Sequence, residues 1–185
     1  MHYCSSCGSS VEFRIPEGDD RQRHVCSSCG TIHYINPRIV AGSIPVWEDR
    51  VLLCKRAIEP RYGYWTLPAG FMENTETTTE AALRETLEEA CAQVELEGLY
   101  TVLNVPHIDQ VHMYFRARML NQEFGAGAES LETALFREDE IPWQELAFPT
   151  VSETLARYFQ DRANNERFEV RVDDIRQRLK PGSKR

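Results

Sequence analysis

Residues 70–92, GFMENTETTTEAALRETLEEACA, decide the fold of this chain, because they hold its clearest helix and its densest group of carboxylates. Thr77-x-x-Glu80 is a capping box, in which two side chains satisfy the free N–H groups at the start of a helix. The residues that follow are rich in alanine, leucine and glutamate, which favour helix. The sequence therefore predicts a helix over residues 78–90.

Three glutamates crowd one side of this helix. At about 100° per residue, Glu85, Glu88 and Glu89 fall within an arc of roughly 100°. Like charges four residues apart destabilise a helix by roughly 0.2–0.5 kcal/mol per pair. The face is either simply solvated or a site for a divalent cation such as Mg²⁺, which binds carboxylate oxygens and bridges to substrate phosphates. The opposite side, expected to face the core, carries Leu83, Leu87 and Ala90.

The spacing of the charged residues resembles the Nudix box, Gly-x5-Glu-x7-Arg-Glu-U-x-Glu-Glu-x-Gly-U, where U is apolar. Gly70, Glu76 and residues 84–89, Arg-Glu-Thr-Leu-Glu-Glu, occupy its opening glycine and all of its charged positions. The resemblance implies an α/β fold, the Nudix α/β/α sandwich with a mixed sheet. It also implies Mg²⁺- or Mn²⁺-dependent cleavage of a nucleoside diphosphate linked to another group.

The resemblance also implies a role for each matching residue. Glu85, Glu88 and Glu89 would be the metal ligands, and Gly70 would turn the backbone tightly and offer its carbonyl to a metal. The remaining charged residues, Glu76 and Arg84, would form an ion pair that braces the loop against the helix.

Three positions depart from the box, and none of them is a ligand position. Thr86 and Ala92 replace larger apolar residues, and Cys91 replaces a glycine that would supply an easy left-handed cap. The helix is therefore expected either to end differently or to run one residue longer. Cys91 and Cys54 are both interpreted as small buried hydrophobes.

The catalytic base is open among three glutamates. Glu85 and Glu89 are the first two candidates. Glu129 is the third, because many family members use a glutamate on a later loop, and Glu129 is the residue that matches it. Glu129 stands beside the glycine-containing loop 125–127, where a surface charge is the alternative interpretation. Arg56 is a candidate for holding a substrate phosphate, with solvation as its alternative.

Four cysteines near the N-terminus have the spacing of a Cys4 zinc ribbon. Cys4-x2-Cys7 and Cys26-x2-Cys29 are separated by 18 residues, and each pair is followed by a glycine. Four thiolates suit a tetrahedral structural Zn²⁺. Two structural disulfides are the alternative.

The chain divides into three expected parts. Residues 1–36 form the zinc ribbon, residues 37–165 the Nudix hydrolase domain, and residues 166–185 a loose C-terminal tail. The order of elements predicts a sheet covered by helices on both faces. Strands are expected over residues 39–47, 51–55, 94–103, 111–120 and 131–136, and an amphipathic helix over residues 151–163.

Composition and charge limit the partners and the cellular compartment that the sequence suggests. The net charge of −8 argues against general binding to nucleic acid or membranes, because no basic surface is indicated. No signal peptide or apolar membrane span is recognisable, and the cysteine pattern fits a reducing cytoplasm. Many Nudix enzymes are dimers, so a homodimer remains an open alternative.

A further resemblance indicates the substrate, which would be a small dinucleotide. The twin cysteine pairs, residues 64–70 and residues 129–132 resemble the plant chloroplast FAD and ADP-ribose diphosphatases of this superfamily. This implies hydrolysis of FAD to FMN and AMP, or of ADP-ribose to AMP and ribose 5-phosphate. The alternatives are an NADH pyrophosphatase, whose signature after the box is missing here, an RNA 5′-cap hydrolase, and a non-catalytic Nudix-like ligand sensor.

Overall fold

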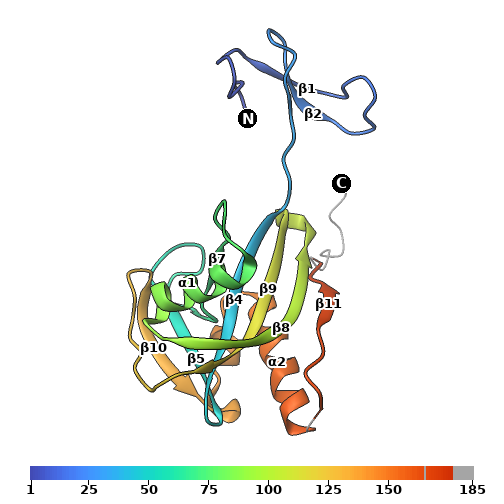
Figure 1. Cartoon of the computed structure of the whole chain (residues 1–185). Coiled ribbons are helices and arrows are strands. Elements are labelled where there is room, and N and C mark those ends of the chain that lie inside the picture. Colours follow the sequence, from blue (N-terminus) through green and yellow to red (C-terminus); the bar gives the residue numbers. More distant parts are fainter. Residues whose placement is uncertain (165, 177–185) are drawn as a thin grey trace. The chain divides into compact units, whose positions relative to one another are not determined.

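The computed structural model describes residues 1–164 and 166–176 of the chain. The protein divides into two compact units, Met1–Pro37 and Arg38–Arg185 (Figure 1). In the first unit, three short antiparallel strands form one sheet in the order β1-β2-β3. Their bounds are Val11–Arg14 for β1, Arg23–Cys26 for β2 and Ile32–His33 for β3.

The second unit is built on a mixed sheet with the strand order β10-β5-β4-β9-β8-β11. Its centre is a parallel pair, β4 and β9, whereas β4 with β5 and β8 with β9 are antiparallel. The predicted mixed sheet is therefore confirmed. The strands are β4 (Arg38–Trp47), β5 (Arg50–Arg56), β6 (Trp65–Thr66), β7 (Ala69–Phe71), β8 (Val94–Val105), β9 (Gln110–Met119), β10 (Ser130–Phe136) and β11 (Arg171–Asp174), with β6 paired to β5 and β7 to β4.

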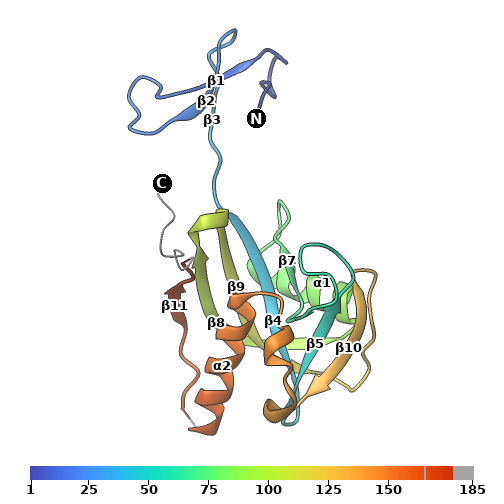
Figure 2. The same ribbon diagram turned by 180° about the vertical axis from the view of Figure 1, so that it is seen from behind.

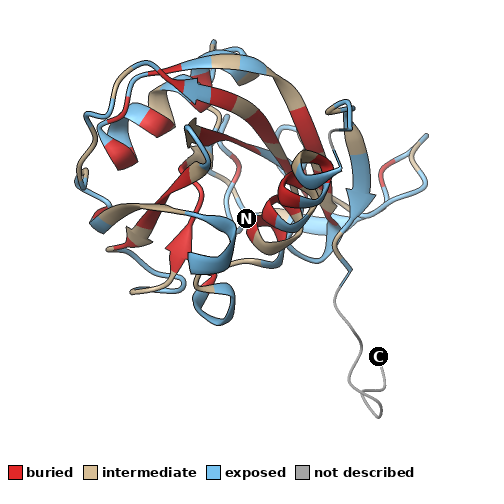
Figure 3. Ribbon diagram, turned by 90° about the horizontal axis from the view of Figure 1, so that it is seen from below, coloured by how far each residue is buried: buried red, intermediate tan, exposed pale blue. Residues whose placement is uncertain are grey.

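Two α-helices cover opposite faces of this sheet, as Figures 1 and 2 show from the two sides. Helix α1 (Thr78–Ala90) packs small residues against Ala41 and Phe115, and α2 (Pro149–Ala163) packs a larger cluster that includes Ile44 and Tyr114. Figure 3 shows buried residues gathered on the strands and on the inner side of α2. Within the described ranges, no helix is long and apolar enough to cross a membrane. Short 3₁₀ turns complete the unit: η1 (Pro106–Ile108), η2 (Glu138–Glu140) and η3 (Trp143–Glu145).

Both ends of α1 follow simple capping chemistry. The Thr77 hydroxyl accepts from Glu80 N at 3.2 Å, and the Glu80 carboxylate accepts from Thr77 N at 2.8 Å, so the predicted capping box is confirmed. The helix ends at Ala90, because Cys91 adopts the left-handed conformation with φ 48°. Cys91 thus takes the backbone role of the missing glycine, and the helix gains no further residue. Its side chain is exposed, which corrects the expectation of a buried thiol, whereas Cys54 is buried as expected.

The core-facing side of α1 differs in part from the one expected, because Ala90 is buried as predicted but the two leucines are not. Leu83 is 39% exposed and Leu87 is 53% exposed. The sheet instead contacts a neighbouring stripe of small or polar residues, so the helix can lie close to β4. Thr86 belongs to that stripe, and its hydroxyl meets the Ser43 hydroxyl at 2.6 Å and donates to the Ala82 carbonyl at 2.7 Å. The buried residues of α1 are Ala81, Ala82, Thr86, Glu89 and Ala90.

The expected loose tail contains a strand. Residues 171–174 form β11, which pairs in parallel with β8. Arg171 donates to the buried carboxylate of Asp161 at 2.7 Å, and Tyr100 donates to the same side chain at 2.8 Å. These contacts fasten the segment to α2 and β8, so the tail assignment is wrong for residues 171–174. Residues 177–185 of the expected tail lie outside the described part of the chain.

Candidate active site

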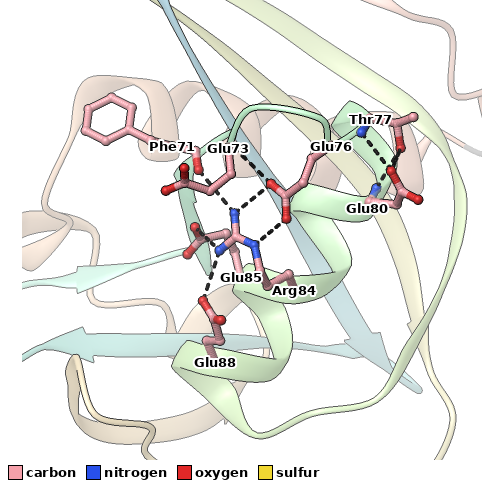
Figure 4. A network of polar contacts seen from close by, with 8 residues as sticks. All are labelled: Phe71, Glu73, Glu76, Thr77, Glu80, Arg84, Glu85 and Glu88. Carbon is pink, nitrogen blue, oxygen red and sulfur yellow. Dashed lines mark hydrogen bonds and ion pairs between the residues drawn. The ribbon is translucent and has the colours of Figure 1, made fainter.

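Arg84 is the centre of an ion-pair network on α1 (Figure 4). It donates to Glu76 at 2.6 and 3.0 Å, which gives the expected brace between loop and helix. It also donates to Glu85 at 2.7 Å and to Glu88 at 2.9 Å, contacts that the sequence did not suggest. A further bond to the Phe71 carbonyl, at 3.1 Å, ties β7 to the helix. The pKa of Glu76 falls to about 2, chiefly through its bond to Arg84.

Glu85 lies against the backbone of β7. A Cβ placed on Gly70 would come within 2.3 Å of the Glu85 carboxylate, so only glycine permits this approach. Burial raises the pKa of Glu85, although its bond to Arg84 acts in the other direction. The structure therefore puts the Gly70 backbone and the Glu85 carboxylate side by side.

Glu89 is the most deeply placed of the three box glutamates. It is only 6% exposed, whereas the Glu88 side chain is 59% exposed. The Ala69 N–H donates to Glu89 at 3.0 Å. Burial raises the pKa of Glu89 to about 7, and the bond from Ala69 opposes this rise. The two glutamates thus differ strongly in environment, although they are adjacent in sequence.

Glu129 is carried to the site by the loop of residues 125–129. Gly125 N donates to Ala90 O at 2.9 Å and Gly127 N donates to Glu89 O at 3.1 Å, so the loop satisfies carbonyls in the last turn of α1. The Glu129 carbonyl accepts from Ala57 N at 2.8 Å, which fixes its backbone. Its charge contributes to the raised pKa of Glu89.

Arg56 is buried, at 9% exposure, so the solvated alternative does not describe it. Its Nε donates to the Pro60 carbonyl at 2.9 Å, and its guanidinium lies 5.2 Å from the centre of the Phe148 ring. These contacts hold the guanidinium at the wall of a cavity that the box glutamates also line. A fixed, buried guanidinium is well suited to an anionic oxygen.

The cavity has a volume of about 720 Å³ and brings the predicted residues of the second unit together. Gly70, Arg56 and the four glutamates at positions 85, 88, 89 and 129 all line it. Glu59 and Glu73 add two more carboxylates, and the only arginines on its wall among the described residues are Arg56 and Arg84. Such an excess of carboxylates repels a diphosphate unless cations enter with it. Hard oxygen donors in this number fit Mg²⁺ or Mn²⁺.

Part of the cavity wall was not predicted from the sequence. Val40, Phe71, Ile108, Gln110 and His112 line it alongside the carboxylates. They come from β4, β7, η1 and β9, which are distant in sequence and meet only through strand pairing. The one signal in the sequence is His112 itself, a polar residue within a strand of mostly apolar character.

The cysteines of the first unit form a compact cluster. All four sulfur atoms lie within 4.8 Å of one another, with Cys4 Sγ 3.7 Å from Cys29 Sγ and Cys7 Sγ 3.5 Å from Cys26 Sγ. A tetrahedron with Zn–S bonds of 2.3 Å has edges of about 3.8 Å, whereas a disulfide bond is about 2.05 Å long. The cluster therefore fits zinc and not two disulfides. A hydrogen bond from the Thr31 side chain helps to lower the pKa of Cys29 to about 6.

Comparison with known proteins gives matches to both units. The family model described as Nudix N-terminal matches residues 2–35, and the NUDIX domain model matches residues 36–160. The crystal structure of a NUDIX hydrolase from Nitrosomonas europaea is 52% identical, with a TM-score of 0.92 over 96% of this chain and 100% of that one.

Two further relatives are more distant in sequence. The ADP-ribose pyrophosphatase of Methanocaldococcus jannaschii is 30% identical over 119 residues, which are 62% of this chain and 69% of the relative. The NAD-capped RNA hydrolase NudC of Photobacterium profundum is 28% identical over 145 residues, 76% of this chain. The match covers 51% of NudC, so this chain spans about half of that relative's length.

Proposed function

This chain belongs to the Nudix hydrolase family, and we propose that it hydrolyses the pyrophosphate bond of a nucleoside diphosphate linked to another group. The observation that carries this proposal is the single cavity in which Glu85, Glu88, Glu89, Glu129 and Arg56 meet. A volume of about 720 Å³ is suitable for a ligand of dinucleotide size. The preferred substrates are ADP-ribose, giving AMP and ribose 5-phosphate, and FAD, giving FMN and AMP.

We assign the metal ligands to Glu85, Glu88, Glu89 and the Gly70 carbonyl. The close approach of Gly70 to Glu85 supports this set, because it brings a carbonyl-bearing backbone to the carboxylate. When bound, Mg²⁺ or Mn²⁺ supplies charge neutralisation and makes water more acidic. Burial chiefly raises the pKa values of Glu85 and Glu89, the neighbouring carboxylates add to the rise, and a bound cation would favour the charged form of both groups.

The remaining residues position the reactants. Arg56 would bind a phosphate oxygen, since its guanidinium is already held by the Pro60 carbonyl and Phe148. Glu129 would accept a proton from the attacking water, with Glu85 and Glu89 as alternative bases. Arg84 would keep Glu85 and Glu88 in place through its bond to Glu76. Cleavage of a phosphoric anhydride depends mainly on such positioning and on electrostatics.

The relatives favour different members of the substrate class. The Methanocaldococcus jannaschii relative is named for ADP-ribose, which supports ADP-ribose here. The NudC relatives are named for NAD-capped RNA, which supports such an RNA as the second candidate substrate. FAD rests on sequence resemblance alone. A non-catalytic sensor is disfavoured, because a protein that only binds its ligand has no need of the complete carboxylate set.

A substrate panel with Mg²⁺ tests the proposal directly. ADP-ribose, FAD and NADH are compared by release of AMP, NAD-capped RNA by release of nicotinamide mononucleotide, and nucleoside triphosphates by release of pyrophosphate or phosphate. We expect AMP from ADP-ribose or FAD at the highest kcat/KM. Binding of a dinucleotide without any product would support the sensor and overturn the enzyme.

Glu88→Gln tests the metal assignment. The Glu88 side chain is exposed and bonded to Arg84, so glutamine should preserve the fold while losing one ligand charge. We expect kcat to fall by about 100-fold or more with an unchanged melting temperature. Glu95→Gln is the matched control, because Glu95 is similarly exposed, at 62%, and pairs with Arg118 away from the cavity. Equal rates in the two variants would contradict the assignment.

We also propose that residues 1–36 act as a structural zinc ribbon, separate from the hydrolase domain of residues 37–165. The sulfur cluster supports this, and thiolate ligands favour a reducing compartment such as the cytoplasm. Metal analysis should find one zinc per chain, and its removal should unfold the small first unit, which has little core of its own. Protein without zinc that keeps an unchanged circular-dichroism spectrum and melting curve would disprove the structural role.

A further inference from the structure

The cysteine cluster of the first unit is contacted by two side chains that can donate hydrogen bonds to it. Cys4 Sγ lies 3.3 Å from Nε2 of His33, a residue of strand β3 (Figure 2). Cys29 Sγ lies 3.1 Å from the hydroxyl of Thr31, which comes just before the same strand. A zinc-bound thiolate carries no proton, so the hydrogen in each contact must come from the ring nitrogen or the hydroxyl.

His33 contacts a ligand of the zinc site and is not itself a ligand. Among the described residues, the metal-binding atoms that all lie within 4.8 Å of one another belong to the four cysteines. Four thiolates complete the tetrahedral coordination of a structural zinc ion. His33 can therefore act on the ion only through the Cys4 sulfur atom.

The two contacted sulfur atoms differ in their access to water. Cys4 is only 3% exposed, whereas Cys29 is exposed. At Cys29, water can replace the Thr31 hydroxyl at little cost. At Cys4, the Ser6 N–H lies 3.4 Å away, and a buried charge that lacks hydrogen bonds is strongly destabilised. The Cys4 thiolate therefore depends more on His33 than the Cys29 thiolate depends on Thr31.

We propose that His33 is a positioning residue of the zinc site, which donates from Nε2 to the Cys4 thiolate and thereby strengthens zinc binding. This inference rests on the proposed structural zinc ribbon, to which it adds a residue that the cysteine spacing does not indicate. The donated hydrogen bond fixes the direction of the sulfur atom and stabilises its negative charge. Loss of such a partner typically weakens metal binding by about 10- to 100-fold.

The zinc affinity of the full chain, measured by competition with a coloured chelator, tests the proposal. His33→Phe removes the donor and should weaken zinc binding by about 10- to 100-fold. His33→Gln should restore most of the affinity, because a side-chain amide N–H can take the place of the ring N–H. This rescue distinguishes the loss of a hydrogen bond from a general loss of folding.

Two residues near β3 provide matched controls. His24 lies directly opposite His33 in the strand pairing and is half-buried like it. Its ring contacts that of Phe13, with the centroids 5.0 Å apart, and its Nε2 lies 3.5 Å from the N-terminal amine. His24→Phe should therefore keep the zinc affinity within about 3-fold of wild type. Thr31→Val should also stay within about 3-fold, because water reaches Cys29.

A spectroscopic measurement reports the hydrogen bond without any change in affinity. In ¹⁵N-histidine spectra of the zinc-loaded protein, the neutral His33 ring should carry its proton on Nε2. The His33→Gln variant identifies this signal, because the signal disappears from its spectrum. A neutral His33 ring with its proton on Nδ1 would contradict the proposal.

The outcomes separate this inference from the zinc ribbon itself. A wild type that binds one zinc ion per chain, with unchanged affinity in His33→Phe, would refute the role of His33 and leave the ribbon in place. Equal losses in His33→Phe and His33→Gln, or in His33→Phe and either control, would also refute that role. A wild type that binds no zinc would refute the ribbon and this inference together.

Discussion

Replacing Gly127 by alanine tests how the loop of residues 125–129 is held against α1. A Cβ on Gly127 would lie 1.7 Å from the Glu88 carbonyl oxygen, so loop and helix must separate. That separation breaks two hydrogen bonds, Gly125 N to Ala90 O and Gly127 N to Glu89 O. At about 0.5–1.5 kcal/mol for each bond, together with lost packing, the free energy of unfolding should fall by about 2–3 kcal/mol.

For a chain of this size, such a loss lowers the melting temperature by about 4–12 °C. The displacement also moves Glu129, two residues further on, so kcat/KM should fall at temperatures where the variant is still folded. Gly125→Ala is the control in the same loop, because nothing lies within 4 Å of its added Cβ. Its melting temperature should stay within about 2 °C of wild type. An unchanged melting temperature for Gly127→Ala, or equal losses in both variants, would refute the close-contact explanation.

Two further predictions concern single residues. Cys91 has φ 48°, a conformation that costs an L-residue about 1–2 kcal/mol. Replacing it by glycine removes this strain, but the greater freedom of glycine in the unfolded chain offsets about 0.5–1 kcal/mol of the stabilisation. Cys91→Gly should therefore raise the melting temperature by about 1–4 °C, and a lower value would contradict the strain. The pKa of His112 is about 4 in the folded protein and 6.5 in its ordinary state, so the unfolded chain binds the proton more readily. The contribution of the neutral His112 ring to the free energy of unfolding is fully present above pH 6.5. This contribution decreases by about 3 kcal/mol as the pH falls to 4. The stability difference between wild type and His112→Phe should show this slope, and a pH-independent difference would argue against the buried neutral ring.

Sequence reasoning succeeded where the signal is local. The capping box at Thr77 and Glu80 fixes the start of α1 through residues three positions apart. The paired cysteines place their sulfur atoms through short turns, so their spacing alone indicated a metal cluster. The alternating strands and α2 were also recognisable, because Val151, Leu155 and Phe159 form one buried stripe.

The failures have a common physical origin in long-range packing. A helical wheel separates two sides of α1, but it does not show that Thr86 would pack against Ser43 on the sheet. Because the helix turns its Thr86 side to the sheet, Leu83 and Leu87 are left exposed. Strand β11 depends on pairing with β8 and on the buried Asp161, both remote in sequence. The burial of Arg56 likewise depends on Phe148, more than ninety residues away.

The alternation along β7 determines how easily such an enzyme can change its substrate during evolution. Gly70 meets the Glu85 carboxylate, and successive residues of a strand point to opposite faces, so Phe71 contributes to a different wall of the cavity. Substitutions at Phe71 or insertions in η1 can therefore change the shape of that wall while the box carboxylates stay in place.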